Sequence, residues 1–147
     1  MADEPRHKEP RRKAYKQDGL TVYWEPRLCI HTGHCFRTLG AVFQPWDTPW
    51  IKLERADAGR IAETVRKCPT GALSFETAEG PETPEVQGLE VTVVPDGPLY
   101  VKGDLQLQAE DGTVLRRATR AALCRCGHSK NKPYCDNSHL EARFRAD

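Results

Sequence analysis

The chain has 147 residues, which is room for one ordinary domain or two small ones. Its 22 lysines and arginines nearly balance 21 aspartates and glutamates, and the net charge of +1 excludes a protein drawn onto nucleic acid or acidic membrane by its overall charge. Hydrophobic residues make up 38% of the chain, so we expect a small apolar core. The six cysteines are the candidate source of additional stability.

The compartment decides how these cysteines are interpreted. The first residues contain no apolar segment of the kind found in secretory signals, and no run of about 18 apolar residues occurs anywhere. We therefore expect a cytoplasmic protein without a membrane span. Cysteines in a reducing cytosol more often bind metals or do chemistry than form disulfides, so metal binding is the first hypothesis.

The N-terminal part of the chain begins with a charged segment. Residues 1–17 are rich in lysine and arginine and lack an apolar period, which predicts a flexible basic arm. Residues 20–24 alternate as a half-buried strand does. Residues 43–51 hold three aromatic residues and two prolines, which predicts an irregular aromatic lid.

A helix is predicted next, from an N-cap at Asp57 to about Lys67. Its apolar residues Ile61 and Val65 recur at helical spacing, and Pro69 cannot continue the helix. Residues 73–75 alternate as a short closing strand does.

The second half of the chain has a residue pattern typical of β-strands joined by turns. An acidic segment with proline and glycine, residues 79–88, predicts a linker, and strands are predicted at 89–94, 99–101 and 105–107, with a hairpin turn at 111–112. We therefore expect an α+β protein with an arm over 1–17, a small α+β unit over 18–78, the linker over 79–88, and a β-rich unit over 89–147.

Three thiols and one imidazole gather near the C-terminus, and the four candidate ligands are Cys124, Cys126, Cys135 and His139. Structural zinc usually takes paired ligands with two to four residues between them, whereas Cys124 and Cys126 have one. Each iron of a [2Fe–2S] cluster needs two ligands, and histidine can replace cysteine. Cys124 and Cys126 can thus serve one iron, and Cys135 and His139 the other. Structural zinc stays as the alternative.

This segment resembles the CDGSH iron–sulfur domain of the mitoNEET class. The family pattern is Cys-x-Cys-x₂-Ser/Thr-x₃-Pro-x-Cys-Asp-Gly-Ser/Ala/Thr-His, and the residues that match it are Cys124, Cys126, Ser129, Pro133, Cys135, Asp136, Ser138 and His139. Asn137 stands where the family has glycine, and asparagine tolerates the left-handed conformation of such a turn. The resemblance covers about residues 88–145 and implies a [2Fe–2S] cluster that transfers electrons or is itself transferred.

A histidine ligand has two physical consequences. It is neutral, so the cluster is easier to reduce than an all-cysteine cluster. A protonated imidazole cannot hold iron, so we expect the cluster held by His139 to become labile as the pH falls.

The other three cysteines form a second set in the N-terminal half. Cys29 and Cys35 fit the first and third positions of the ferredoxin pattern Cys-x₂-Cys-x₂-Cys, Cys68-Pro69 fits the distant Cys-Pro, and Thr32 occupies the second position. Residues 20–76 resemble the divergent single-cluster ferredoxins, which implies a cubane-type cluster in a ferredoxin-like unit.

Three thiolates leave this cluster one ligand short, because no cysteine remains. We favour [3Fe–4S], since threonine is a poor ligand for iron. The alternative is [4Fe–4S], with its fourth iron held by His31, His34 or an exogenous ligand. We expect His31 and His34 to make hydrogen bonds or packing contacts around the cluster, and Thr32 to leave the position open. Nearby tryptophan and phenylalanine side chains could shield this cluster from water.

The leading functional hypothesis is electron transfer by a protein with two clusters of different type. The alternatives are a pH- or redox-sensitive cluster carrier or sensor, and a structural zinc-binding module. The expected partners are redox proteins or apo-acceptors, with no nucleic acid and no membrane, and the chain is expected to be a monomer or a homodimer. We do not expect an enzyme, because the ligand sets are closed or nearly so and no catalytic motif is recognisable.

Overall fold

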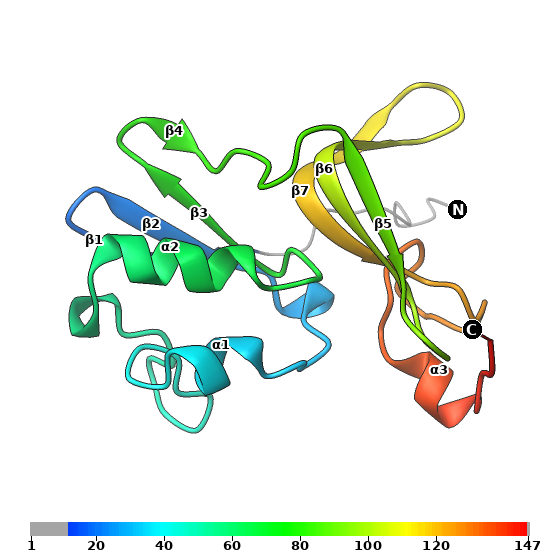
Figure 1. Ribbon diagram of the computed structural model, residues 1–147, viewed down its shortest axis with the longest axis horizontal. Helices are drawn as coiled ribbons and strands as arrows, with labels where there is room; N and C mark the ends of the chain where they lie inside the picture. The colour runs from blue at the N-terminus through cyan, green and yellow to red at the C-terminus, as the bar shows by residue number, and fades with distance from the viewer. Residues whose placement is uncertain (1–11, 147) are drawn as a thin grey trace, which may run out of the picture.

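The computed structural model describes residues 12–146, which form an α+β protein with two antiparallel sheets. The first sheet has the strand order β1-β2-β3-β4, and the second has the order β5-β6-β7. Figure 1 shows them side by side, the first sheet with its helices on the left and the second sheet on the right. The α+β class predicted from the sequence is confirmed.

The first sheet is built on a hairpin that corrects one prediction. Strand β1 (Lys13–Gln17) pairs with β2 (Leu20–Trp24), whereas we expected residues 1–17 to be a flexible arm. The turn residues Asp18 and Gly19 have φ of 44° and 79°, the left-handed geometry that tight hairpins favour. The Asp-Gly pair was the sequence signal for this hairpin. Residues 1–11 of the predicted arm lie outside the described residues.

The predicted closing strand is also present. β3 (Leu73–Thr77) pairs with β2, and β4 (Gly80–Pro81) adds two residues at its other edge. Since β4 falls inside residues 79–88, the start of the predicted linker belongs to the first sheet.

Helices of this unit lie beside the sheet and carry the cysteine-bearing segments. They are the 3₁₀ turn η1 (Pro26–Leu28), α1 (His34–Thr38), the 3₁₀ turn η2 (Leu53–Arg55) and α2 (Ala58–Arg66). The predicted helix is confirmed as α2, and the Asp57 carboxylate caps it by accepting a hydrogen bond of 3.1 Å from the backbone N–H of Arg60.

The main apolar core lies between α2 and the first sheet. Its buried residues are Leu20, Val22, Leu39, Val42, Phe43, Ile51, Leu53, Ile61, Val65, Leu73 and Phe75. The segment predicted as an irregular aromatic lid contributes Phe43 and Ile51, which face each other in an isolated bridge. All the buried members come from residues 20–75, so this core belongs to the N-terminal unit.

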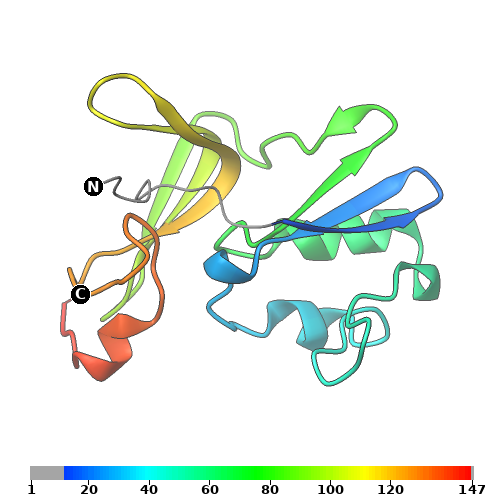
Figure 2. The same ribbon diagram turned by 180° about the vertical axis from the view of Figure 1, so that it is seen from behind.

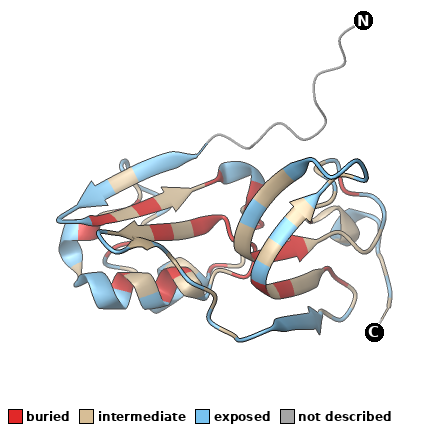
Figure 3. Ribbon diagram, turned by 90° about the horizontal axis from the view of Figure 1, so that it is seen from above, coloured by how far each residue is buried: buried red, intermediate tan, exposed pale blue. Residues whose placement is uncertain are grey.

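The second sheet contains β5 (Leu89–Val93), β6 (Leu99–Gln108) and β7 (Val114–Leu123), followed by α3 (Ser138–Glu141). The hairpin predicted at Asp111-Gly112 joins β6 to β7 and is confirmed. The strands predicted at 99–101 and 105–107 are one strand, whose pairing is interrupted between Lys102 and Leu105. Figure 3 shows that β5 is exposed along its length, whereas the buried residues of β7 lie on the part nearest the first unit.

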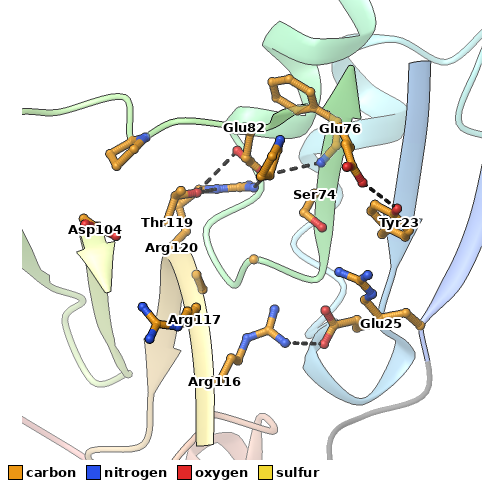
Figure 4. Close-up of a pocket in the computed structure, with 16 residues that line it drawn as sticks. Tyr23, Glu25, Ser74, Glu76, Glu82, Asp104, Arg116, Arg117, Thr119 and Arg120 are labelled. Atoms are coloured by element: carbon orange, nitrogen blue, oxygen red, sulfur yellow. Dashed lines mark hydrogen bonds and ion pairs between the residues drawn. The ribbon is translucent and has the colours of Figure 1, made fainter. Parts of the chain in front are cut away.

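Two buried ion pairs join the units. The Arg116 guanidinium donates to Glu25 at 2.6 Å, and that of Arg120 donates to Glu82 at 2.8 Å (Figure 4). Arg120 also donates to the backbone carbonyls of Val65, Cys68 and Leu73 at 2.5 to 2.8 Å. β7 is thereby tied to the end of α2 and the start of β3. No helix within residues 12–146 is long and apolar enough to cross a membrane.

Candidate metal centres

The C-terminal candidate ligands are brought together where β7 ends. The backbone N–H of Cys124 donates to Pro133 and that of Cys135 donates to Ala122, each at 2.8 Å. Two cysteines eleven positions apart therefore lie on neighbouring stretches of paired backbone. His139 comes from the first turn of α3, which begins after Asn137.

The four side chains form two close pairs. The sulfurs of Cys124 and Cys126 are 3.8 Å apart, and the Cys135 sulfur is 3.6 Å from Nδ1 of His139. A tetrahedral metal with bonds of about 2.3 Å to sulfur and about 2.0 Å to nitrogen separates two sulfurs by about 3.8 Å, and sulfur from nitrogen by about 3.5 Å. Each pair thus fits one tetrahedral metal. Both pairs line the same gap between the ligand loop and Gly97-Pro98, and no space in that gap is large enough for a water molecule in this structure.

The loop that holds these ligands is supported by two polar residues of the motif. The Ser129 hydroxyl donates to the carbonyl of Tyr134 at 2.6 Å. The Asp136 carboxylate accepts from the backbone N–H groups of Lys130 and Ser138, at 2.9 and 3.0 Å. Asn137 has φ of 71°, so it adopts the left-handed conformation expected where it replaces glycine.

The electrostatic surroundings differ between the two pairs. Burial by itself raises the pKa of Cys124, but backbone N–H groups of Ser129 and Gly127, together with the Lys132 charge, bring the pKa below its usual value. Burial raises the pKa of Cys135, an effect that the Asn137 N–H reduces. The site therefore offers donors aimed at sulfur, as a negatively charged cluster requires.

The N-terminal candidate ligands line a mostly apolar cavity of about 300 Å³. Cys29 follows η1, Cys35 lies in α1, and Cys68 follows α2, so three separate elements each deliver one thiol. Burial raises the pKa of the Cys29 thiol and raises that of Cys35 to about 11. The Cys68 thiol adds to both pKa shifts, and the Cys29 thiol adds to that of Cys35. The three sulfurs are thus close enough to affect one another, as ligands of one cluster must be.

The three residues considered for the fourth position all border this cavity. Nδ1 of His31 lies 3.7 Å from the Cys29 sulfur, and His31 has φ of 59°. That separation suits a hydrogen bond from His31 to the Cys29 sulfur better than ligation of the fourth iron by His31. Two ligands of different irons in a cubane point away from each other and would lie farther apart. His34 is exposed, and Thr32 is held by its carbonyl, which accepts from Arg37 at 2.6 Å.

Aromatic residues close one side of the cavity. Trp24 and Trp50 line it and contact each other edge to face, with ring centroids 4.9 Å apart. The aromatic residues that we considered as shields for the cluster are Trp24, Phe43, Trp46 and Trp50. Phe43 belongs to the core and Trp46 is 73% exposed, so of these four only Trp24 and Trp50 border the cavity.

Trp24 also has a buried polar atom that suits a cluster. Its indole Nε1 makes no hydrogen bond of good geometry among the described residues, although it lies near enough to Cys29 to favour the thiolate. A buried N–H without an acceptor is uncommon in proteins, and a cluster sulfur would accept from it.

All six cysteines are free. Among residues 12–146, no three cysteine, histidine, aspartate or glutamate side chains converge tightly enough to hold a single metal ion. The donor chemistry of both sets nevertheless fits iron–sulfur clusters: soft thiolates, one imidazole and backbone N–H groups near sulfur, with a cavity beside the N-terminal set.

Two family models match the chain in the order in which the two sites occur. A model described as "Divergent 4Fe-4S mono-cluster" matches residues 15–78, and one described as "Iron-binding zinc finger CDGSH type" matches residues 96–140. The uncharacterized protein YjdI of Escherichia coli, in strain K12 and in O157:H7, is 30% identical to this chain over 63 residues, which are 43% of this chain and 83% of YjdI.

The fold and the two cysteine sets thus define an iron–sulfur protein. The chain belongs to the divergent 4Fe-4S mono-cluster family through its N-terminal half and to the CDGSH iron-binding family through its C-terminal half.

The sequence did not reveal the residues that connect the two sites. Arg120 was not singled out, because its acceptors lie 38 to 55 positions away in the chain. Thr70 was not singled out either, and its hydroxyl lies 3.5 Å from the Cys68 sulfur. The Cys-Pro-Thr-Gly run was a signal for the contact of Thr70 with Cys68, whereas no nearby residue pattern marked the contacts of Arg120.

Proposed function

We propose that this chain is an electron-transfer protein with two clusters of different type. A [2Fe–2S] cluster is held by Cys124, Cys126, Cys135 and His139, and a [3Fe–4S] cluster is held by Cys29, Cys35 and Cys68. Such clusters accept and return single electrons. The observation that carries the proposal is the adjacency of the two sets: Ile30, next to Cys29, packs against Cys135 across the interface between the units.

The N-terminal cluster can be completed in two ways, without a fourth iron or with a fourth iron that has a ligand other than cysteine. The contact between His31 and Cys29 supports a [3Fe–4S] cluster with His31 as a hydrogen-bond donor. The matching family, a divergent 4Fe-4S mono-cluster family, supports [4Fe–4S], with a ligand other than cysteine on the fourth iron. The proposed electron-transfer role is the same for both.

A cluster carrier is the second candidate function. Cys124, Cys126 and His139 are only partly buried, so the C-terminal cluster would lie close to solvent. A partner with free thiols could approach it there. The proposed partners are therefore redox proteins for electron transfer and apo-acceptors for cluster transfer. Since all six cysteines are free, a reducing cytoplasmic location also remains part of the proposal.

A reduction experiment separates these functions. Anaerobically purified protein is reduced chemically and mixed with an oxidised one-electron acceptor protein, and the same protein is mixed separately with a cluster-free [2Fe–2S] ferredoxin. Electron transfer predicts reoxidation of both centres with the iron retained. Loss of iron to the ferredoxin, with slow reoxidation, would favour the carrier instead. Cys35→Ser and Cys126→Ser serve as controls, each removing one centre. A colourless protein that holds zinc would contradict both functions.

A further inference from the structure

A continuous path of bonds joins the two candidate centres. Cys29 is bonded to Ile30, and the Ile30 carbonyl accepts a hydrogen bond of 2.8 Å from the Asn137 side-chain amide. The backbone N–H of Asn137 in turn donates to the Cys135 sulfur at 3.4 Å. The path therefore runs from a ligand of one centre to a ligand of the other through covalent bonds and two hydrogen bonds.

Packed apolar side chains cover the middle of this path, whereas Cys29 and Asn137 are only partly buried. Ile30 is buried, and it forms a small apolar cluster with Ala122 and Cys135, against which Tyr100 packs. Figure 2 shows the segment after β2 passing next to the loop of the C-terminal unit, and the contacts of Ile30 place the two there. Bonds and packed atoms carry an electron over a given distance better than water or empty space does.

The residue that makes the connection is also the one that departs from the motif. A glycine at position 137 would fit the φ of 71° with no strain, but it would have no side chain to reach Ile30. Asparagine accepts the same backbone conformation and adds an amide donor. The departure is thus explained by a contact that exists only because a second unit lies alongside.

We propose that Asn137 is a positioning residue that holds Ile30 and Cys135 in register and thereby completes the route for electrons between the two centres. This inference rests on the proposed electron-transfer function. In each event one centre is oxidised by one electron and the other is reduced by one electron. No bond is broken and no proton moves. Outside the chain, a one-electron donor protein supplies the electron and a one-electron acceptor protein removes it.

The test variant is Asn137→Gly, which keeps the turn and removes the amide. The control is Asn131→Ala, because the Asn131 side-chain amide makes an equivalent hydrogen bond between the units, 2.8 Å long, to the carbonyl of Arg27. Arg27 is two residues from Cys29, and the Asn131 carbonyl accepts from the N–H of Tyr134, which precedes Cys135, at 3.0 Å. The connection through Asn131 therefore passes through more covalent bonds than the route through Asn137. Both variants keep the ion pairs of Arg116 and Arg120 that hold the units together.

The measurement is the rate at which an electron redistributes between the centres after a pulse of a photogenerated one-electron reductant, followed at wavelengths where their spectra differ. We expect Asn137→Gly to slow redistribution several-fold and Asn131→Ala to leave it unchanged. A second readout is the magnetic coupling between the centres in electron paramagnetic resonance, which reports their separation. It should be the same in all three proteins, because the ion pairs set the distance.

Each outcome bears on one hypothesis. If Asn137→Gly redistributes electrons as fast as the wild type, or if Asn131→Ala slows redistribution equally, the route through Asn137 is wrong while the proposed function stands. A weaker magnetic coupling in Asn137→Gly would mean that the units have separated, which also overturns the route. If the wild type takes up electrons but never redistributes them, the proposed function itself fails.

Discussion

Replacing Arg120 by methionine tests the contact that joins the two units. Its side chain is 4% exposed, and that of its partner Glu82 is 7% exposed. The substitution keeps an unbranched, apolar stem but leaves the Glu82 carboxylate buried without its partner. It also removes donors from the carbonyls of Val65, Cys68 and Leu73. Removing one member of a buried ion pair costs about 3–5 kcal/mol.

Urea unfolding of the cluster-loaded protein, followed by tryptophan fluorescence, measures this loss. With a denaturant dependence of about 2 kcal/mol per molar, the midpoint should fall by about 2 M. Arg145→Met is the matched control, because Arg145 pairs with Asp96 at 3.5 Å but is 77% exposed. It should change the free energy of unfolding by less than about 0.5 kcal/mol.

A second variant separates the causes of the expected loss. In the double variant Arg120→Met with Glu82→Leu no buried charge is left unpaired, so part of the stability should return. A loss below about 1 kcal/mol for Arg120→Met would show instead that the Arg120–Glu82 pair contributes no more than an exposed ion pair does.

Three further predictions concern single positions. Gly71→Ala should destabilise the protein by about 2 kcal/mol more than Gly19→Ala in urea unfolding. Both glycines have a left-handed φ, but only at Gly71 would a Cβ lie 2.5 Å from a backbone oxygen of β7. Equal losses of stability would show that this close approach does not matter. His139→Cys should retain the visible absorbance of the C-terminal cluster at an acidic pH where the wild type loses it, because an imidazole is protonated and leaves iron as the pH falls; unchanged acid lability would show that another group controls it. Trp24→Phe should lower the reduction potential of the N-terminal centre in a spectroscopic titration, because an N–H donor to sulfur favours the more negative reduced cluster. Trp46→Phe, at an exposed position, should leave that potential unchanged. A potential shift of equal size in both variants would mean that general packing causes it.

The sequence predicted those features that depend on neighbours along the chain. The helix after Asp57 follows from a cap and an apolar period, and the hairpin at Asp111-Gly112 follows from its turn residues. The close pair of Cys124 and Cys126 follows from their spacing. In each case the interactions that form the feature join residues that are close together in the chain.

The features that the sequence did not predict depend on contacts between distant segments. β1 was expected to be part of an arm because its charged residues hide the pairing with β2. The short helices α1 and α3 are held by the loops around them, since helices of four or five residues are not stable alone. The acceptors of Arg120 and Asn137 lie in the other unit, and no local pattern specifies how two units pack.

The central claim is that one chain holds two clusters of different type on separate ligand sets. Electron paramagnetic resonance of anaerobically purified protein, before and after reduction, tests it most directly. We expect a [3Fe–4S] signal in the oxidised protein and a [2Fe–2S] signal after reduction. Cys35→Ser should abolish only the first signal, and Cys126→Ser only the second. A single signal that disappears in both variants, or zinc in place of iron, would contradict the account.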